Sequence, residues 1–212
     1  MNLPNKLTIA RIILVPFFMV FMLVPIPFPG NGEYICRTIA AVIFLVAAYT
    51  DHLDGKIARK YDLITDFGKF LDPLADKMMV LGAMLGLTVL ASSDVTASGS
   101  VYMRLTAALC FIVLFRELAV TSLRLAASGS KGVVIAANML GKIKTVSQIV
   151  YVMVALLEPV LFLGLLGKVP FFAFLGTSHI LSYLLMAVVA VTTVWSGLNY
   201  FKAYFPLIDP KK

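Results

Sequence analysis

Charged residues are scarce in this sequence. Only 14% of the 212 residues are Asp, Glu, Lys or Arg, whereas a soluble domain carries about a quarter. Hydrophobic residues make up 60% of the chain, and the mean hydropathy is +0.95. This balance excludes a water-soluble globular domain and predicts an integral membrane protein.

Cysteine is also rare. The two cysteines, Cys36 and Cys110, both fall in apolar segments and lack the close spacing of a metal site, so we expect buried thiols. No small-residue cleavage site follows the first apolar run, which argues against a signal peptide. Neither an internal repeat nor a low-complexity tail is visible.

Long apolar runs dominate what is present. About 20 apolar residues are needed to cross ~30 Å of hydrocarbon, and a chain in lipid must form its own backbone hydrogen bonds, which here requires helices. We expect a single domain over residues 1–212, an all-α membrane protein that begins with a short interfacial helix in "MNLPNKLT". The six predicted spans are residues 8–28, 34–57, 70–91, 103–126, 145–166 and 178–202.

Lys and Arg gather on one side of the predicted spans. Of the 18 basic residues, 15 lie on the side of the two termini, and the other three are Arg37, Arg104 and Lys168. The positive-inside rule places the crowded side in the cytoplasm, so we expect a multi-pass protein of the cell membrane. Its pI of about 9.5 then reflects loops that face anionic lipid headgroups, and we expect no nucleic-acid partner.

Four aspartates stand where the second span ends and the third begins. Asp51 and Asp54 are three residues apart, and Asp72 and Asp76 are four apart, so each pair lies on one helix face. Because a short loop makes successive helices antiparallel neighbours, we expect the two pairs to face each other. Carboxylates so close together at the membrane edge repel one another and need a cation.

The nature of that cation follows from the ligands. Oxygen donors without nearby cysteine favour Mg²⁺ or Mn²⁺ over zinc. Two ions would balance four negative charges, and a two-metal site suits displacement at phosphorus. The alternative is a solvated network in which the aspartates pair with neighbouring basic residues, namely Lys56, Arg59, Lys60, Lys69 and Lys77.

The aspartates belong to a longer pattern, D-x₂-D-G-x₂-A-R-x₈-G-x₃-D-x₃-D. Its remaining members are Gly55, Ala58, Arg59 and Gly68. The pattern resembles the signature of the CDP-alcohol phosphatidyltransferases, six-helix membrane enzymes that move a phosphatidyl group from CDP-diacylglycerol to an alcohol. The resemblance implies that the four aspartates bind two metal ions, that Asp76 also takes the proton of the attacking hydroxyl, and that the protein is a homodimer.

The resemblance also places the cytidine nucleotide against Gly55, Ala58, Arg59 and Gly68. The residue types agree, because glycine and alanine allow close approach and arginine pairs with phosphate. At the start of the chain, Asn5, Thr8 and Arg11 are candidates to close over the active site. Helix capping is an equal alternative for Asn5 and Thr8.

A second polar cluster extends over residues 115–148. Arg116 and Arg124 are eight residues apart and share a helix face, and Arg116 lies too deep in its span to be a simple flanking charge. We expect a basic cluster that binds an acceptor carrying its own phosphate. Its candidate members are Arg116, Arg124, Lys131, Lys142 and Lys144, with Arg11 added from the first span. For Lys131, a flanking charge under the positive-inside rule is the alternative.

This segment and the start "MNLPNKLTIARI" resemble the branch of the family whose acceptor is sn-glycerol 3-phosphate. The predicted products are phosphatidylglycerophosphate and CMP. Other acceptors stay open, namely serine, inositol phosphate and phosphatidylglycerol. So does a divalent-cation transporter, although transporters place their sites near the midplane, often in repeated halves. A third alternative is a lipid-binding scaffold without catalysis.

Overall fold

The structure is a computed structural model that describes residues 2–24, 26–61, 63, 65–92, 97–131 and 139–204, without the side chains of His52, Arg59, Asp66, Lys69 and residues 97–98 and 125–131. Within this part of the chain every regular element is a helix. In chain order they are α1 (Leu3–Leu23), α2 (Gly32–Lys60), α3 (Asp66–Ser92), α4 (Ala97–Lys131), α5 (Met139–Pro159), the π-helix η1 (Val160–Leu165), α6 (Pro170–Ser178) and α7 (Ile180–Tyr204).

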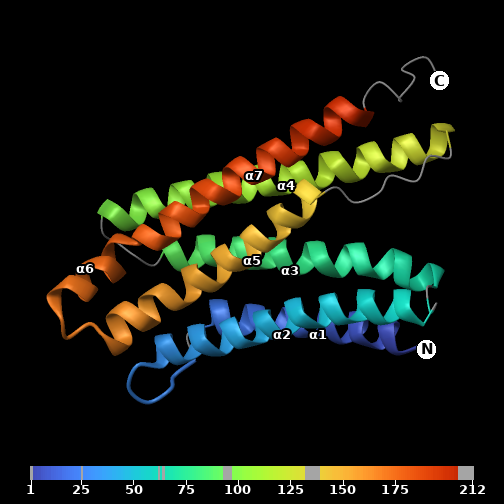
Figure 1. The fold of residues 1–212 in the computed structure, drawn as a ribbon. Helices are drawn as coiled ribbons and strands as arrows, with labels where there is room; N and C mark the ends of the chain where they lie inside the picture. The colour runs from blue at the N-terminus through green and yellow to red at the C-terminus, as the bar shows by residue number, and fades with distance from the viewer. Residues whose placement is uncertain are drawn as a thin grey trace.

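The helices pack as a closed ring. The main contacts run from α1 to α2, from α2 to α5, from α5 to α7, from α7 to α4, from α4 to α3 and from α3 back to α1. Figure 1 shows this bundle from the side, with α4 and α7 forming one edge and α1 and α2 the other. The beginning of α1 and the end of α7 lie at the same end of the bundle, as an even number of spans requires.

Among the described residues, six helices are long and apolar enough to cross a membrane, so the predicted all-α membrane fold is confirmed. Several boundaries differ from prediction. The helices of the fourth and fifth spans begin earlier than expected, at Ala97 and Met139, and two further differences lie in the first span. There is no separate interfacial helix, because residues 3–7 form the first turns of α1, which Asn2 caps by accepting a hydrogen bond from the Asn5 N–H at 3.2 Å. The first span ends at Leu23 rather than at residue 28, since the prolines of "VPIPFP" cannot continue a helix.

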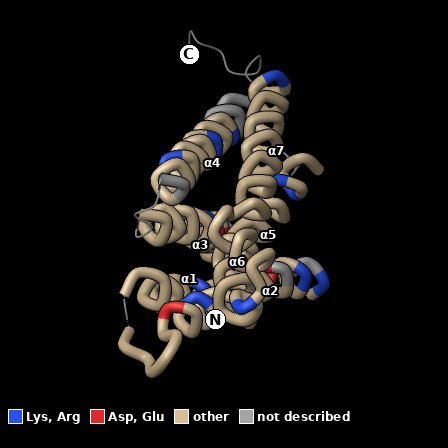
Figure 2. Tube along the Cα trace, turned by 90° about the vertical axis from the view of Figure 1, so that its left-hand side faces the viewer, with Lys and Arg blue, Asp and Glu red and all other residues tan. Residues whose placement is uncertain are grey.

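The bundle is apolar outside and carries its buried polar groups inside. Large hydrophobic side chains such as Phe70, Phe111 and Trp195 are exposed, and charged positions are few along the tube in Figure 2. Both cysteines are buried free thiols, as predicted. The buried polar side chains include Arg11, Asp54, Lys144 and Gln148. Such an arrangement suits a chain surrounded by lipid that holds a polar site within its ring of helices.

Glu158, for which the sequence suggests no role, joins two helices. The backbone N–H groups of Leu181 and Ser182 each donate to its carboxylate at 3.0 Å, and the Ser182 hydroxyl donates as well. These are first-turn donors of α7, which begins after His179 at a left-handed φ of 50°. A carboxylate is favoured at a helix N-terminus, so Glu158 stabilises the junction between α5 and α7.

Candidate active site

The four aspartates converge, but not through direct packing of their helices. Asp51 and Asp54 lie near the end of α2, and Asp72 and Asp76 near the start of α3. We expected α2 and α3 to be neighbours, yet they barely touch, because α1 packs against both of them. The two aspartate pairs therefore meet across side chains that α1 supplies.

Arg11 of α1 occupies the centre of this cluster. Its Nη1 lies 2.8 Å from Asp51 Oδ1 and 2.8 Å from Asp76 Oδ1, and its Nη2 pairs with Asp54 Oδ2. The arginine side chain is fully buried. From the sequence we expected Arg11 to join the basic residues of the fourth and fifth spans, but the structure places it among the aspartates. A guanidinium has five donors and suits several carboxylates at once.

Thr8, one turn before Arg11, reaches the fourth aspartate. Its hydroxyl lies 2.6 Å from Asp72 Oδ1. Asn5, a further turn back, donates from Nδ2 to Thr65 Oγ1 at 3.0 Å. Since Asn2 provides the helix cap, these two side chains do not cap α1; they tie it to the aspartates and to the α2–α3 connection.

Gly68 is fitted closely to Asn5. A Cβ atom at this position would lie 2.9 Å from Asn5 Oδ1 and 3.3 Å from Thr65 Oγ1, and the Gly68 N–H donates to that threonine oxygen at 3.0 Å. Asn5, Thr8 and Gly68 are thus brought to one side of the aspartate cluster. Gly55 and Ala58 follow the first aspartate pair on α2. The side chain of Arg59 lies outside the described part of the chain.

The cluster fits a cation by its chemistry. All four acidic groups offer hard oxygen donors, and three of them already share one positively charged partner. Among the described residues, no three acidic, His or Cys side chains form a ready ion cage, and the Arg11 guanidinium contacts one oxygen each of Asp51, Asp54 and Asp76. The aspartates are therefore suited to divalent ions once Arg11 yields part of its contacts.

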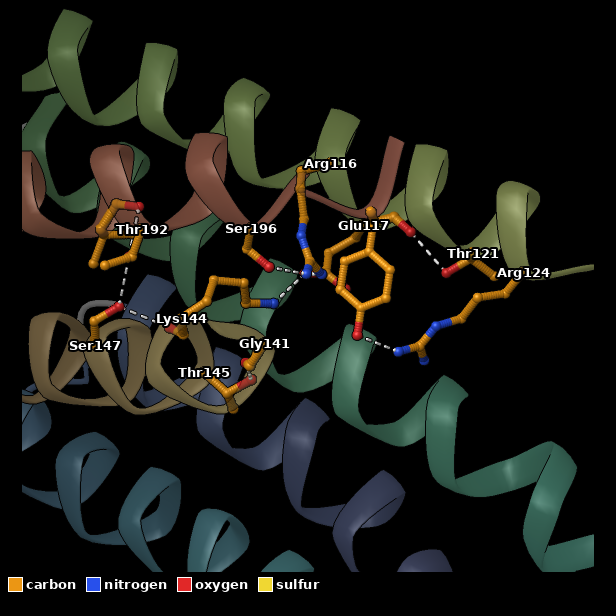
Figure 3. A network of polar contacts seen from close by, with 12 residues as sticks. Arg116, Glu117, Thr121, Arg124, Gly141, Lys144, Thr145, Ser147, Thr192 and Ser196 are labelled. Atoms are coloured by element: carbon orange, nitrogen blue, oxygen red, sulfur yellow. Dashed lines mark hydrogen bonds and ion pairs between the residues drawn. The ribbon is translucent and has the colours of Figure 1, made fainter. Parts of the chain in front are cut away.

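The second predicted cluster also forms, with partners that the sequence analysis did not identify. Arg116 donates to Ser196 Oγ at 2.6 Å, and Arg124 donates to the Tyr200 hydroxyl at 2.8 Å. The Tyr200 ring lies 5.5 Å from the Arg116 guanidinium carbon and 5.0 Å from that of Arg124. Figure 3 shows both arginines directed from α4 toward α7. Cation–π contacts of this kind hold the two guanidinium groups near one aromatic ring.

Glu117 links this cluster to α5. Its Oε1 accepts from Arg116 Nη1 at 3.1 Å and from Lys144 Nζ, and Lys144 is buried (Figure 3). Lys142 is exposed and, two positions from Lys144, points to another side of the helix. The side chain of Lys131 is outside the described residues. Of the five predicted α4–α5 members, the structure therefore brings together Arg116, Arg124 and Lys144.

A cavity of about 100 Å³ joins the two clusters. Asp51 and Asp76 line it from α2 and α3, and Glu117 and Lys144 line it from α4 and α5. Lys77 and Gln148 contribute as well. Acidic groups that suit metal ions and basic groups that suit a phosphate thus border the same space. That pairing is typical of a site for transfer chemistry on phosphorus.

Comparison with known families agrees with this site. A family model for CDP-alcohol phosphatidyltransferases matches residues 1–195. The chain therefore belongs to the CDP-alcohol phosphatidyltransferase family, whose members are membrane-embedded transferases that generally use divalent metal ions. The family resemblance expected from the aspartate pattern is confirmed.

Three relatives show which members the chain resembles. It is 44% identical over 163 residues to a Bacillus subtilis protein named CDP-diacylglycerol–glycerol-3-phosphate 3-phosphatidyltransferase, covering 74% of this chain and 77% of that protein. It is 35% identical over 204 residues to an Escherichia coli protein of the same name, covering 95% and 94%. A Mycobacterium tuberculosis protein named probable phosphatidylglycerophosphate synthase is 33% identical over 200 residues, covering 94% and 79%.

Proposed function

We propose that this protein transfers the phosphatidyl group of CDP-diacylglycerol to sn-glycerol 3-phosphate, which yields phosphatidylglycerophosphate and CMP. The observation that carries the proposal is the cavity that Asp51 and Asp76 line together with Lys144, which Glu117 connects to Arg116. An acceptor with its own phosphate would bring negative charge to the basic side and a hydroxyl to the acidic side. The names of the relatives favour the same acceptor.

The position of each group of residues indicates which of the two substrates it would bind. Arg116, Arg124 and Lys144 would bind the acceptor phosphate, with Lys131 and Lys142 as further candidates. The nucleotide would lie against Asn5, Thr8 and the motif residues Gly55, Ala58, Arg59 and Gly68. Binding both substrates in one small space would supply much of the rate enhancement, since an oriented pair reacts as one molecule.

The chemical step is a displacement at phosphorus. The acceptor hydroxyl oxygen forms a bond to the lipid-linked phosphorus of CDP-diacylglycerol while its proton passes to the Asp76 carboxylate. The bond between that phosphorus and the oxygen of the cytidine phosphate breaks, and CMP leaves with the electron pair. Two Mg²⁺ or Mn²⁺ ions held by Asp51, Asp54, Asp72 and Asp76 would supply neutralisation of the pyrophosphate charge and activation of the hydroxyl.

Arg11 could take one of two positions once the metal ions and the nucleotide are bound. It now contacts three carboxylates, so in the loaded site it would share them with the metal ions or turn toward the pyrophosphate. Either position keeps it beside the nucleotide rather than beside the acceptor phosphate. Arg11 thus acts on the donor side of the reaction in this proposal.

The experiment supplies purified protein with CDP-diacylglycerol and Mg²⁺ and measures CMP release. sn-Glycerol 3-phosphate should support release, whereas serine, inositol phosphate and phosphatidylglycerol should not. Release with one of the other alcohols and not with glycerol 3-phosphate would reassign the acceptor. Divalent-ion uptake into vesicles without CMP release would favour the transporter alternative, and an absence of both would favour the lipid-binding scaffold.

The proposed setting is the cytoplasmic face of the plasma membrane. The ends of the helices that carry the site also carry most of the Lys and Arg residues. A reporter fused after the C-terminus should therefore be active only if it functions in the cytoplasm. The homodimer implied by the resemblance stays a prediction, which chemical crosslinking in native membranes would test.

A further inference from the structure

Gln148 carries a buried amide for which the described residues provide no hydrogen-bond partner. Its side chain lies on α5, one helical turn beyond Lys144, and the residue is 1% exposed. Neither Oε1 nor Nε2 has a hydrogen-bond partner within the described part of the chain. Buried polar atoms are almost always hydrogen-bonded, because leaving them unpaired forfeits the bonds they would make with water. An unpaired amide at this depth therefore points to a ligand.

The position of Gln148 shows where that ligand would lie. Gln148 lines the cavity that Asp76 and Lys144 also border. Residues four apart share a helix face, so the amide lies next to Lys144 and deeper in the bundle. Met79 and Val80 line the same inner region and offer no hydrogen bonds. In this apolar surrounding the Gln148 amide is the polar group that a deeply placed substrate atom would meet.

The chemistry of an amide matches a hydroxyl. Gln148 carries one acceptor oxygen and two N–H donors, and an alcohol both donates and accepts. sn-Glycerol 3-phosphate has a phosphate, an attacking hydroxyl and a second hydroxyl between them. The basic cluster and Asp76 account for the first two groups, and the second hydroxyl still needs a partner.

We propose that Gln148 binds the second hydroxyl of the acceptor and so selects a phosphorylated diol over acceptors without that group. This inference rests on the proposed function. Three anchors, at the basic cluster, at Asp76 and at Gln148, would fix the orientation of a three-carbon acceptor. A site built to hydrogen-bond a substrate hydroxyl rejects the analogue lacking it, because the buried amide is then left unpaired.

The test combines one substitution in the protein with one change in the acceptor, as in a double-mutant cycle. Wild-type protein and Gln148→Met, which is close in length and volume and lacks the amide, are each assayed with sn-glycerol 3-phosphate and with 3-hydroxypropyl phosphate. The second compound keeps the phosphate and the attacking hydroxyl but lacks the hydroxyl between them. CMP release at saturating CDP-diacylglycerol gives kcat/KM for each of the four combinations.

We expect kcat/KM of the wild type to fall at least tenfold on the deoxy acceptor. Gln148→Met should lose a similar factor on glycerol 3-phosphate and lose little more on the deoxy acceptor, since the contact is already absent. Independent losses that multiply, which leave the discrimination between the two acceptors unchanged in the variant, would overturn the proposal. Gln148 would then not contact that hydroxyl, and its amide would be satisfied by another partner such as an internal water.

A matched control guards against a general effect of removing a buried polar atom. Thr193 on α7 is 0% exposed, its Oγ1 also lacks a partner within the described residues, and it does not line the cavity. Thr193→Val should leave the preference between the two acceptors unchanged. If Gln148→Met does not fold, Gln148→Asn retains the amide one methylene further away and should weaken the same preference.

Failure of the inference and failure of the proposed function give different results. A wild type that releases CMP with glycerol 3-phosphate, while Gln148→Met discriminates like the wild type, overturns only the role of Gln148. A wild type that releases no CMP with either acceptor overturns the function itself. The KM for CDP-diacylglycerol should stay constant across all variants, which a merely loosened fold would not preserve.

Discussion

Asp76 of α3 and Lys144 of α5 line one cavity, although 68 positions separate them in the chain. The Asp76 side chain is 51% exposed, whereas Lys144 is buried against Glu117. The carboxylate is thus accessible to a substrate in the cavity, and the ammonium group is held in place. The accessible Asp76 carboxylate is suited to accept a proton from the substrate, and the immobilised Lys144 ammonium group is suited to bind a negatively charged substrate group.

Asp76→Asn should abolish turnover while the protein stays folded. The amide is nearly isosteric but cannot accept the hydroxyl proton, and loss of a general base costs roughly 10²–10⁴-fold in rate. The measurement is CMP release, together with thermal unfolding in detergent. Glu33→Gln is the matched control, because Glu33 pairs with Arg37 at the opposite end of the bundle. Normal activity in Asp76→Asn would remove Asp76 from the mechanism.

Removal of the metal ions should abolish activity but change the stability of the fold little. Since Arg11 already forms ion pairs with Asp51, Asp54 and Asp76 and offsets part of their charge, chelation by EDTA should stop CMP release and change the unfolding temperature of the wild type little. Arg11→Met leaves the buried Asp54 carboxylate without this charged partner, and breaking a buried ion pair costs about 3–5 kcal/mol. We expect this variant to unfold at a clearly lower temperature in EDTA and to recover partly in Mg²⁺.

Arg37→Met is the control for that experiment, because it removes an arginine whose carboxylate partner is exposed. Its unfolding temperature should not respond to Mg²⁺. Equal responses in the two variants would mean that the metal ions do not share the carboxylates of Arg11. A wild type that unfolds on chelation would show instead that the arginine alone does not hold the aspartates together.

The aspartate end of the site could be predicted from sequence because its information is local. The i,i+3 and i,i+4 spacings fix which carboxylates share a helix face, and the span boundaries fix their depth. Family, fold class and six spans are confirmed. The central position of Arg11 was missed, since the sequence does not reveal that α1 packs between α2 and α3.

The partners of the basic cluster were missed for a related reason. Ser196 and Tyr200 lie in an apolar span, 80 and 76 positions from the arginines they contact. Their spacing of four residues places them on one face of α7, which is the only local signal of a shared role. Gln148 stands four residues after Lys144, which places the two on one face of α5 but does not show that the amide is buried. Only the packing of the ring shows that its amide is buried beside the cavity.

Tyr200→Phe should weaken acceptor binding more than turnover. The ring that lies between Arg116 and Arg124 remains, but the hydroxyl that accepts from Arg124 at 2.8 Å is lost. A hydrogen bond to a charged group contributes about 1.5–3 kcal/mol, so we expect the KM for glycerol 3-phosphate to rise roughly tenfold. Steady-state kinetics at saturating CDP-diacylglycerol measure this. Tyr49→Phe, at an exposed position, serves as the control, and a fall in kcat alone would contradict the assignment.

Gly68→Ala should impair the donor side and leave the acceptor side intact. Its Cβ would lie 2.9 Å from Asn5 Oδ1, closer than such atoms approach, so the Asn5 side chain must shift, which disturbs its hydrogen bond to Thr65. We expect the KM for CDP-diacylglycerol to rise several-fold at constant KM for glycerol 3-phosphate. Gly32→Ala is the control, because there the nearest atom would be 3.4 Å away and alanine favours the helix.

A double variant decides whether the effect of Gly68→Ala acts through Asn5. If the displaced asparagine is the cause, adding Gly68→Ala to Asn5→Ala should cost almost nothing further, because residues in contact have non-additive effects. If the nucleotide itself lies against the Gly68 Cα, the added methyl group should instead raise the KM for CDP-diacylglycerol again in the Asn5→Ala background. The two outcomes separate a glycine that makes room for α1 from a glycine that makes room for the substrate.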